Sequence, residues 1–354
     1  MMTLRRSGTG QGAIPPGTVW YISDLGEFRG KQELYTRQSP QRLKALREHV
    51  LIESAVSSNR IEGVSIDPSR VRDILLTPKP LFRDRDEEEV RGYRDKLAWI
   101  HAEASNIPSD EQTVKRLHAL TRGQIWDAGQ YQEKDGDIIE RYPDGSERVR
   151  FRTVPAAEIS ARMADLVLDW RRCQNEGWVP PLIALAAFNL DFLCIHPFRD
   201  GNGRVSRLLW LLQSYQLGFE VGRYISLERL VEQNKDRYYE TLGKSSQGWH
   251  EGKHDPWPYI NYVLFILKTA YKEFAERVGE TKAPRGAKTD QVISAIEQLV
   301  GEFSVAQLEM RCPGVSRDMV RRVLREQQAA GKVECQGRGP AARWRKKERV
   351  ITLW

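Results

Sequence analysis

The sequence predicts a mainly helical protein, in which a helical bundle with one small β-hairpin is followed by a compact C-terminal domain. Apolar residues recur at helical spacing along most of the chain, with Asp, Ser or Pro near the start of many such segments. In the body, residues 137–154 alternate apolar and polar residues on both sides of a Pro-Asp-Gly turn, which is typical of a hairpin; an exposed loop is the alternative. Residues 281–290, rich in Pro, Gly and Lys, predict a linker.

The helical patterns divide the chain into regions. Residues 1–38 lack the apolar core of a signal peptide, so we expect a flexible or irregular segment. We expect an N-terminal helical region at residues 39–110, the core of the body at residues 111–280, and the C-terminal domain at residues 291–354. The pattern at residues 180–195 is apolar nearly all round, which predicts a buried central helix. The helical patterns cover residues 39–63, 67–76, 86–104, 109–123, 156–173, 180–195, 205–217, 226–244 and 255–278.

Composition and charge narrow the class of protein. The chain has 354 residues, of which 40% are apolar, and no apolar run reaches the roughly 20 residues that a membrane span needs. Residues 280–354 hold fifteen Lys and Arg against nine Asp and Glu, so they account for six of the seven net positive charges. The cysteines lack metal-ligand spacing, which favours a reducing, cytoplasmic environment. They are Cys173, Cys194, Cys312 and Cys335.

One short motif concentrates the chemistry. Residues 196–207, HPFRDGNGRVSR, combine a histidine, an acid, two glycines and three arginines, and lead into an apolar helical pattern. The turn at residues 200–203 contains residue types that tolerate left-handed backbone angles, so its N–H groups can point at one place. Free N–H groups and the dipole of a following helix attract an anion, and we expect phosphate. Arg204 and Arg207 are three residues apart and therefore share a helix face.

This motif resembles the signature of the Fic family, His-Pro-Phe-x-(Asp/Glu)-Gly-Asn-Gly-Arg-x-x-Arg, at all nine fixed positions. The apolar pattern before it, the AGQY at residues 128–131, the hairpin and the downstream RYY are also similar to the family, so the resemblance covers residues 40–278. It implies a Fic-type helical bundle with the hairpin as a flap beside the motif. The family transfers AMP from ATP, with Mg²⁺, to a protein hydroxyl. ATP and a protein with an exposed Tyr, Thr or Ser are the implied substrates.

The chemistry of the residues agrees with the roles that the resemblance implies. His196 suits removal of the hydroxyl proton near neutral pH. Asp200, the one carboxylate of the loop, is expected to hold Mg²⁺ between phosphates. A capping or core histidine is the alternative, but it leaves the neighbouring acid and arginines unexplained. The residues expected to bind the phosphates are Gly201, Asn202, Gly203, Arg204 and Arg207.

A second motif predicts inhibition. Residues 58–63, SNRIEG, match the family's inhibitory pattern Ser/Thr-x-x-x-Glu-Gly/Asn, with Ser58 and Glu62 at fixed positions. The resemblance implies that Glu62 pairs with Arg207, which otherwise steadies the γ-phosphate. A carboxylate in the site repels a triphosphate and competes for its arginine. The resemblance also allows Glu62 to orient water for removal of AMP. A plain helix end is the alternative, since Ser, Glu and Gly are common there.

Further features concern what binds beside the motif. The family's flap holds a target segment by main-chain pairing, which orients a target without fixing its identity. The hairpin in this chain is longer and more charged than the short form, and Gln132 stands where Arg is common; both affect target recognition rather than the chemistry. Tyr238 and Tyr239 lie where the family lines its adenine pocket, and ordinary core aromatics are the alternative.

The C-terminal domain resembles a winged helix-turn-helix. Helical patterns at residues 289–303, 304–312 and 316–333 precede a strand pair broken by Gly and Pro, and Ser316 is expected to cap the third helix. The basic surface of that helix and of the strand pair predicts DNA contact, with protein contact as the alternative. The arginines of the third helix are Arg317, Arg321, Arg322 and Arg325.

Together these features predict an autoinhibited protein adenylyltransferase with a C-terminal winged helix. One alternative is a transcription regulator whose body only senses nucleotide; a sensor has no need to keep His196, Asp200 and Arg204 together. The other is a Fic transferase that uses another nucleotide or a phosphocholine donor, which the motif alone does not exclude. The target protein, self-modification and a homo-oligomer stay open.

Overall fold

The computed structural model describes residues 1–8, 13–38, 40–64, 66–122, 126–141, 146–279, 287–299, 301–312, 315–337, 339 and 342–347. The chain divides into two compact units. The first holds residues 1–35 and 47–275, and the second holds residues 36–46 and 276–354. The three regions that the sequence analysis separates, at residues 1–38, 39–110 and 111–280, therefore contribute mainly to one unit.

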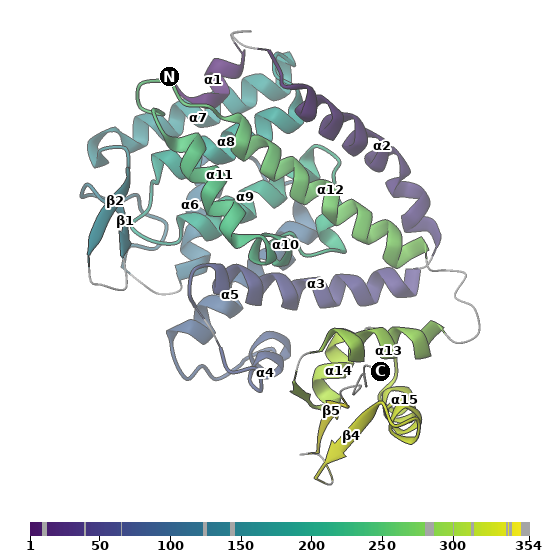
Figure 1. Ribbon diagram of the computed structural model, residues 1–354. Helices are drawn as coiled ribbons and strands as arrows, with labels where there is room; N and C mark the ends of the chain where they lie inside the picture. The colour runs from purple at the N-terminus through teal and green to yellow at the C-terminus, as the bar shows by residue number, and fades with distance from the viewer. Residues whose placement is uncertain are drawn as a thin grey trace, which may run out of the picture. The chain divides into compact units, whose positions relative to one another are not determined.

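The first unit is a bundle of helices with one hairpin, and Figure 1 shows its arrangement. Helix α3 (Pro40–Ile61) belongs to this unit from residue 47 onward. The predicted fold class, mainly helical with a small hairpin, is confirmed for this unit. The remaining elements, in chain order, are α1 (Thr3–Gly8), α2 (Pro16–Gln38), α4 (Val71–Leu76), α5 (Arg85–Glu103), α6 (Glu111–Arg122), β1 (Asp137–Arg141), β2 (Glu147–Arg152), α7 (Ala156–Glu176), α8 (Pro181–Ile195), α9 (Asn202–Gln216), the 3₁₀ turn η1 (Val221–Arg223), α10 (Leu227–Gln233), α11 (Lys235–Ser246) and α12 (Trp257–Gly279).

Helix α8 is the centre of the bundle. All residues from 182 to 195 are buried, and α8 contacts α1, α7, α9 and α11. A helix that is apolar on every side can only be accommodated where other helices surround it, as the sequence analysis predicts for this segment. Its C-terminal end leads directly into the 196–207 motif, so a buried helix positions the motif's first residue.

The expectation of an irregular segment at residues 1–38 is wrong for the residues described, because α1 and α2 occupy most of them. The carboxylate of Asp191 on α8 accepts the N–H groups of Thr3 and Leu4, both at 2.8 Å. A six-residue helix is unstable alone, and here a buried carboxylate satisfies its first N–H groups. The helix depends on a tertiary contact that local sequence patterns do not reveal.

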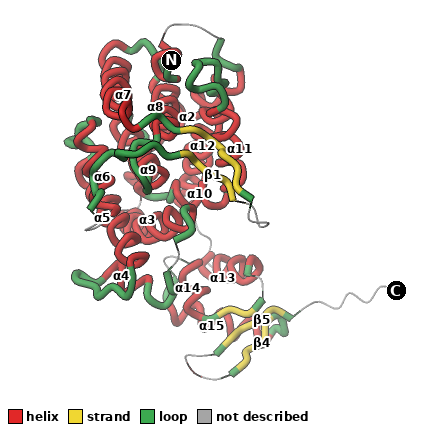
Figure 2. The backbone as a smooth tube through the Cα atoms, turned by 90° about the vertical axis from the view of Figure 1, so that its left-hand side faces the viewer, coloured by secondary structure: helices red, strands yellow, loops and turns green. Residues whose placement is uncertain are grey.

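The predicted hairpin is present. Strands β1 and β2 pair antiparallel, with Ile138 opposite Phe151 and an irregularity of register after Ile138. The turn predicted at residues 142–145 lies outside the described residues. The two strands lie against one side of the bundle near α11, and they run across the face nearest the viewer in Figure 2.

The second unit has the element order helix, strand, helix, helix, strand, strand. Its strands form an antiparallel sheet of order β3-β5-β4, and Ser316 caps the third helix as predicted. A buried apolar cluster that includes Phe303, Leu308, Val320 and Trp344 forms its core. The elements are α13 (Ala287–Gln298), β3 (Glu302–Phe303), α14 (Val305–Arg311), α15 (Arg317–Ala329), β4 (Val333–Gln336) and β5 (Arg343–Lys346).

The linker predicted at residues 281–290 is too long at its C-terminal end. Residues 280–286 lie outside the described residues, while residues 287–290 already belong to α13. The first residues of α13 are polar and follow a basic, Pro-containing stretch, so they show no apolar helical pattern. The sequence analysis therefore places the start of this helix too late.

Two general expectations can be compared with the described residues. Cys173, Cys194, Cys312 and Cys335 are free cysteines. In the part of the chain that the structure describes, no helix is both long enough and apolar enough to cross a membrane.

Candidate active site

The motif begins where α8 ends. His196 caps the C-terminus of α8 with φ 54° and ψ 57°, and among the described non-glycine residues it alone has a positive φ. Its N–H donates to the carbonyl of Phe192 at 2.9 Å. A non-glycine residue in this conformation is uncommon, and such residues often occur at functional sites, where the surrounding structure holds them.

A contact with the carbonyl oxygen of Leu193 determines the state of the His196 ring. Nδ1 lies 3.3 Å from that oxygen, and because a carbonyl only accepts, Nδ1 carries the proton and Nε2 keeps its lone pair. Burial lowers the pKa of His196, and the contact with Leu193 opposes this shift only in part. The ring is therefore neutral at pH 7 and can accept a proton at Nε2.

The next residues form a loop held from within. Asn202 accepts the N–H of Phe198 at Oδ1 over 3.0 Å and donates from Nδ2 to the carbonyl of Phe198 over 2.6 Å. Both residues are buried. The sequence analysis assigns Asn202 to the phosphates, but its side chain instead ties the loop to the start of α9.

Asp200 lies at the tip of this loop. Its carboxylate is half-exposed, and Oδ1 accepts the N–H of Gly201 at 2.6 Å. Oδ2 lies 3.7 Å from the guanidinium of Arg204 and 4.0 Å from that of Arg85. Gly201 has φ 83° and caps the N-terminus of α9, so the positive end of this helix lies at the loop.

Arg204 is buried beneath the loop rather than exposed in front of it. Its guanidinium pairs with the carboxylate of Glu89 and donates to Asn59 Oδ1 at 3.2 Å. The sequence analysis predicts neither contact, because both partners lie more than a hundred residues from Arg204. Glu89 stands in an ordinary helical pattern, and Asn59 stands at a variable position of the SNRIEG motif. In this arrangement Arg204 holds α3 and α5 against the motif helix.

Arg207 meets both fixed residues of the SNRIEG motif. Its Nε donates to Ser58 Oγ at 2.9 Å, and its Nη2 donates to the carbonyl of Ser58 at 2.9 Å and to Glu62 Oε1 at 2.8 Å. Burial disfavours the charge of Arg207, but the carboxylate of Glu62 keeps its pKa above the ordinary value. Nη1 is buried and has no hydrogen-bond partner among the described residues.

Gly203 lies directly under the carboxylate of Glu62. A Cβ placed on Gly203 would come 2.3 Å from Glu62 Oε1 and 3.3 Å from Nη1 of Arg207. Any larger residue would therefore displace the carboxylate from its position over the first turn of α9.

A cavity of about 240 Å³ opens beside His196. Its wall is formed by the flap on one side and by α8, α9 and α11 on the others. Nη1 of Arg207, which has no hydrogen-bond partner among the described residues, lies close to Gly203, and Gly203 lines the cavity together with Glu62. The lining residues are Glu62, Ile138, Arg150, Phe151, Leu193, Cys194, His196, Gly203, Tyr238, Tyr239, Leu242, Gly243 and Ser246.

The two tyrosines from α11 differ in setting. Tyr238 is buried against Tyr259 and Tyr262, so it is a core aromatic that also reaches the cavity wall. Tyr239 is partly exposed, and its hydroxyl donates to the carbonyl of Ile61 at 3.4 Å. Arg150 of the flap donates to the Tyr239 carbonyl at 2.7 Å and lies over its ring.

A model of the Fic/DOC family matches residues 108–213, a span that runs from just before α6 into α9 and includes the whole motif. Residues 108–213 of the chain are thus similar to the Fic/DOC family.

Solved Fic structures have the same fold. A Fic family protein from Desulfovibrio desulfuricans G20 is 25% identical, with a TM-score of 0.61 over 96% of this chain and 98% of that chain. A Fic domain-containing signaling protein from Bacteroides thetaiotaomicron is 20% identical, with a TM-score of 0.58 over 72% of this chain and 97% of its own.

The curated relatives are longer proteins, and the chain matches only part of each. The protein adenylyltransferase Fic of Nematostella vectensis is 25% identical over 214 residues, which cover 58% of this chain and 44% of the relative. The corresponding protein of Drosophila melanogaster is 21% identical over 291 residues, or 74% of this chain and 54% of the relative. The chain thus spans about half the length of the curated relatives that it matches.

The sequence analysis missed one buried histidine of the Fic domain. His118 on α6 accepts the N–H of Gly129 at Nδ1 over 2.9 Å, and its Nε2 lies 3.0 Å from the carbonyl oxygen of Asp200. Its ring stacks on Phe198 with centroids 3.9 Å apart. The available signal was a histidine at an apolar position of an amphipathic helix, which alone is ambiguous.

Gln132, noted in the sequence as a departure from the family, also contacts the motif. Its N–H donates to the carbonyl of Pro197 at 2.9 Å, and its side-chain amide donates to the carbonyl of His196 at 3.3 Å. An arginine side chain at this position would reach further, whereas this glutamine holds the first two residues of the motif.

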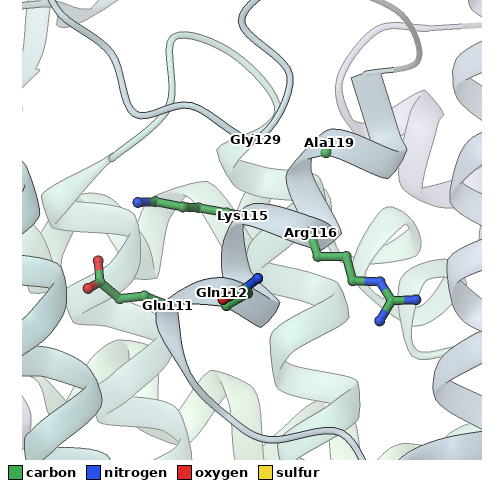
Figure 3. Close-up of a pocket in the computed structure, with 6 residues that line it drawn as sticks. All are labelled: Glu111, Gln112, Lys115, Arg116, Ala119 and Gly129. Atoms are coloured by element: carbon green, nitrogen blue, oxygen red, sulfur yellow. The ribbon is translucent and has the colours of Figure 1, made fainter.

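A second hollow of about 570 Å³ lies on the outer face of α6, and Figure 3 shows the side chains around it. It is open and mixed in charge, and it reaches Gly129 but none of the residues predicted for the site. Its lining residues are Glu111, Gln112, Lys115, Arg116, Ala119 and Gly129.

Proposed function

We propose that the chain is a protein adenylyltransferase that moves AMP from ATP to a Tyr, Thr or Ser hydroxyl of a target protein or of itself. The observation that carries the proposal is a neutral His196, with Nε2 as its basic nitrogen, in a cavity that Gly203 also lines at the start of α9. Nη1 of Arg207, which has no hydrogen-bond partner among the described residues, lies close to Gly203. The names of the relatives in Nematostella and Drosophila support the same activity.

The proposed reaction assigns the proton and the bonds as follows. The target hydroxyl attacks the α-phosphorus of ATP while Nε2 of His196 takes its proton. An oxygen–phosphorus bond forms to the target, the bond to pyrophosphate breaks, and pyrophosphate leaves. The N-terminus of α9 and Nη1 of Arg207 favour the negative charge of the phosphates.

Magnesium is expected to arrive with ATP. The half-exposed carboxylate of Asp200 is the donor that the loop offers, and the described residues include no group of three His, Cys, Asp or Glu side chains arranged for a metal. This fits Mg²⁺, which is commonly held by one or two carboxylates together with substrate phosphates. When bound, it would neutralise phosphate charge.

The contact between Glu62 and Arg207 supports autoinhibition. The carboxylate takes Nη2 of Arg207 and lies over Gly203, next to the proposed phosphate position. A triphosphate there would meet a like charge and would share the arginine with Glu62. In a rotated position, the same carboxylate is proposed to orient water for removal of AMP.

The flap is proposed to hold the target. A two-stranded hairpin leaves one edge of each strand unpaired, and such an edge can pair with an extended peptide. Ile138 and Phe151 place the flap in the wall of the cavity, within reach of His196.

The second unit is proposed to be a winged helix that contacts DNA. Its order of helices and strands agrees with that fold, and Arg321 and Arg325 are exposed on α15. Some of the basic charge is compensated by pairs such as Arg317 with Glu309 and Arg322 with Glu326. Phosphate contact by the remaining charge would make DNA binding strongly salt-dependent.

The test is to incubate the Glu62→Gly protein with ATP labelled at the α-phosphate, alone and in a cell lysate. Labelled protein is expected in both, with self-modification visible in the first. Parallel reactions with the other nucleoside triphosphates and with CDP-choline test the donor. Binding of nucleotide without any transferred label would contradict the proposal and favour a nucleotide sensor.

A further inference from the structure

His118 has a position that no role assigned so far explains. It is buried on α6, yet both of its ring nitrogens contact backbone groups outside that helix. One contact is with Gly129 in the segment before the flap, and the other is with Asp200 at the tip of the motif loop.

These contacts determine the tautomer of His118. The N–H of Gly129 can only donate, so Nδ1 must be unprotonated. In a neutral ring Nε2 then carries the proton, and it donates to the carbonyl of Asp200. Gly129 thereby orients a hydrogen bond that is made to the motif loop.

The hydrogen bond to Asp200 acts on one peptide plane. The carbonyl of Asp200 and the N–H of Gly201 belong to the same planar peptide and point in opposite directions. His118 holds the carbonyl, and the N–H of Gly201 holds Oδ1 of the Asp200 carboxylate at 2.6 Å. Rotation of this peptide plane would move the N–H of Gly201, which donates to the Asp200 carboxylate.

The ring of His118 also supports the loop by stacking. It lies parallel to the ring of Phe198 with an interplanar angle of 3°, and the backbone N–H and carbonyl of Phe198 are held by the side-chain amide of Asn202. His118 therefore contacts the loop on both sides of Arg199, through a ring stack before it and a hydrogen bond after it.

We propose that His118 is a positioning residue that sets the direction of the Asp200 carboxylate through the Asp200–Gly201 peptide. The proposal rests on the proposed function in that Asp200 is taken to bind Mg²⁺ with ATP. His118 itself touches neither. Groups that orient a metal-binding residue typically change metal affinity by about ten-fold or more when they are removed.

Three substitutions separate the parts of this contact. In His118→Gln the side-chain amide can still reach and donate to the carbonyl of Asp200, as Nε2 does. In His118→Asn the side-chain oxygen can still accept from Gly129, as Nδ1 does, but the donor to Asp200 is lost. In His118→Phe the stack on Phe198 is kept and both hydrogen bonds are lost. His101→Gln is the control, since His101 is a histidine of α5 that contacts Tyr215 and not the loop.

The main measurement is ATP binding by calorimetry, in Mg²⁺ and in EDTA, in a Glu62→Gly, His196→Ala background that does not turn over. We expect Mg²⁺ to strengthen ATP binding, and this gain to fall about ten-fold in His118→Asn and His118→Phe. The gain should persist in His118→Gln and in His101→Gln. Thermal unfolding midpoints show which variants are folded and how far each is destabilised.

The outcomes separate the two proposals. If His118→Phe or His118→Asn is folded and keeps the full Mg²⁺ gain, the positioning role is overturned. It is equally overturned if the gain falls in step with the unfolding midpoint in all variants, His101→Gln included. Transfer by the Glu62→Gly protein is measured separately: absence of transfer with a His118-dependent Mg²⁺ gain removes the proposed function and leaves the positioning role standing.

Discussion

The backbone conformation and ring tautomer of His196, the residue that carries the proposed chemistry, depend on residues just before it in the chain. His196 stands at the end of a buried helix in a left-handed conformation, its Nδ1 turned to Leu193 and its Nε2 left as the basic nitrogen. The motif identifies this histidine and predicts its role. It does not predict the tautomer, which depends on a backbone carbonyl three residues earlier.

We expect His196→Ala to reduce transfer by about 10²–10⁴-fold, the usual contribution of a general base, with ATP affinity nearly unchanged because the phosphate groups keep their partners. Burial lowers the pKa of His196 from its ordinary value of 6.5, so the ring stays neutral at a lower pH than an exposed histidine would. Transfer should therefore fall only when the pH drops below 6.5. The measurements are initial rates of label transfer from pH 5 to 8 and calorimetry with ATP. Transfer within a few-fold of the unsubstituted protein would contradict the role.

Asp200 gives a second test at this scale. We expect Asp200→Ala to lose Mg²⁺-dependent transfer, because the loop then offers no carboxylate. We also expect EDTA to abolish transfer by the protein that keeps Asp200. Asp200→Asn keeps the side-chain size and one oxygen, and serves as the matched comparison. Undiminished labelling in EDTA would point to a reaction that needs no metal.

At the scale of elements, the hairpin and the segment that follows α3 both contribute to the wall of the cavity beside His196. The sequence predicts both, since alternation marks the hairpin and SNRIEG marks the end of α3. It does not predict the short α1, the pairing of Arg204 with Glu89, or the hydrogen bond of His118 to Asp200. Each of these joins elements that are distant in the chain, and none changes the local pattern of apolar residues.

The end of α3 yields the strongest prediction. We expect Glu62→Gly to raise label transfer sharply, because Arg207 then becomes available to the γ-phosphate. Without ATP, the buried guanidinium loses its carboxylate, so the unfolding midpoint should fall, and ATP should restore it. Transfer, removal of label and unfolding midpoints are compared with and without ATP. Glu62→Gln removes the charge and keeps the size of the side chain. It therefore separates repulsion of the phosphates by the carboxylate from simple filling of the space over Gly203.

Two results would count against these roles of Glu62. Uptake of label that does not rise in Glu62→Gly excludes inhibition by this residue. Removal of label that continues in Glu62→Gly excludes its role in hydrolysis.

At the scale of the whole molecule, the chain combines a helical unit that carries the motif with a second, basic unit. The charge distribution predicts this division, and the described residues divide near the same place, at residue 276. The sequence does not predict that residues 36–46 group with the second unit, because contact across more than two hundred residues leaves no mark on local composition.

We expect removal of residues 282–354 to leave transfer by the Glu62→Gly protein in place, since the site residues all lie in the first unit. If the second unit binds DNA, the full chain should bind duplex DNA with an affinity that falls steeply with salt, and the shortened chain should not. Electrophoretic or fluorescence titrations at 50 and 200 mM salt, roughly the range in which phosphate contacts lose most of their affinity, make the comparison. Binding that is absent, or independent of salt, favours a protein partner.

The glycine at position 203 has a consequence of its own. Gly203 lies within α9 and has an ordinary helical backbone, so its conformation does not require glycine. What requires it is the carboxylate of Glu62 at 2.3 Å from any added methyl group. The sequence analysis expects a phosphate at the same residue, so the proposed inhibition would depend on volume as well as on charge. A carboxylate that already fills the space over Gly203 leaves no room there for a second oxyanion.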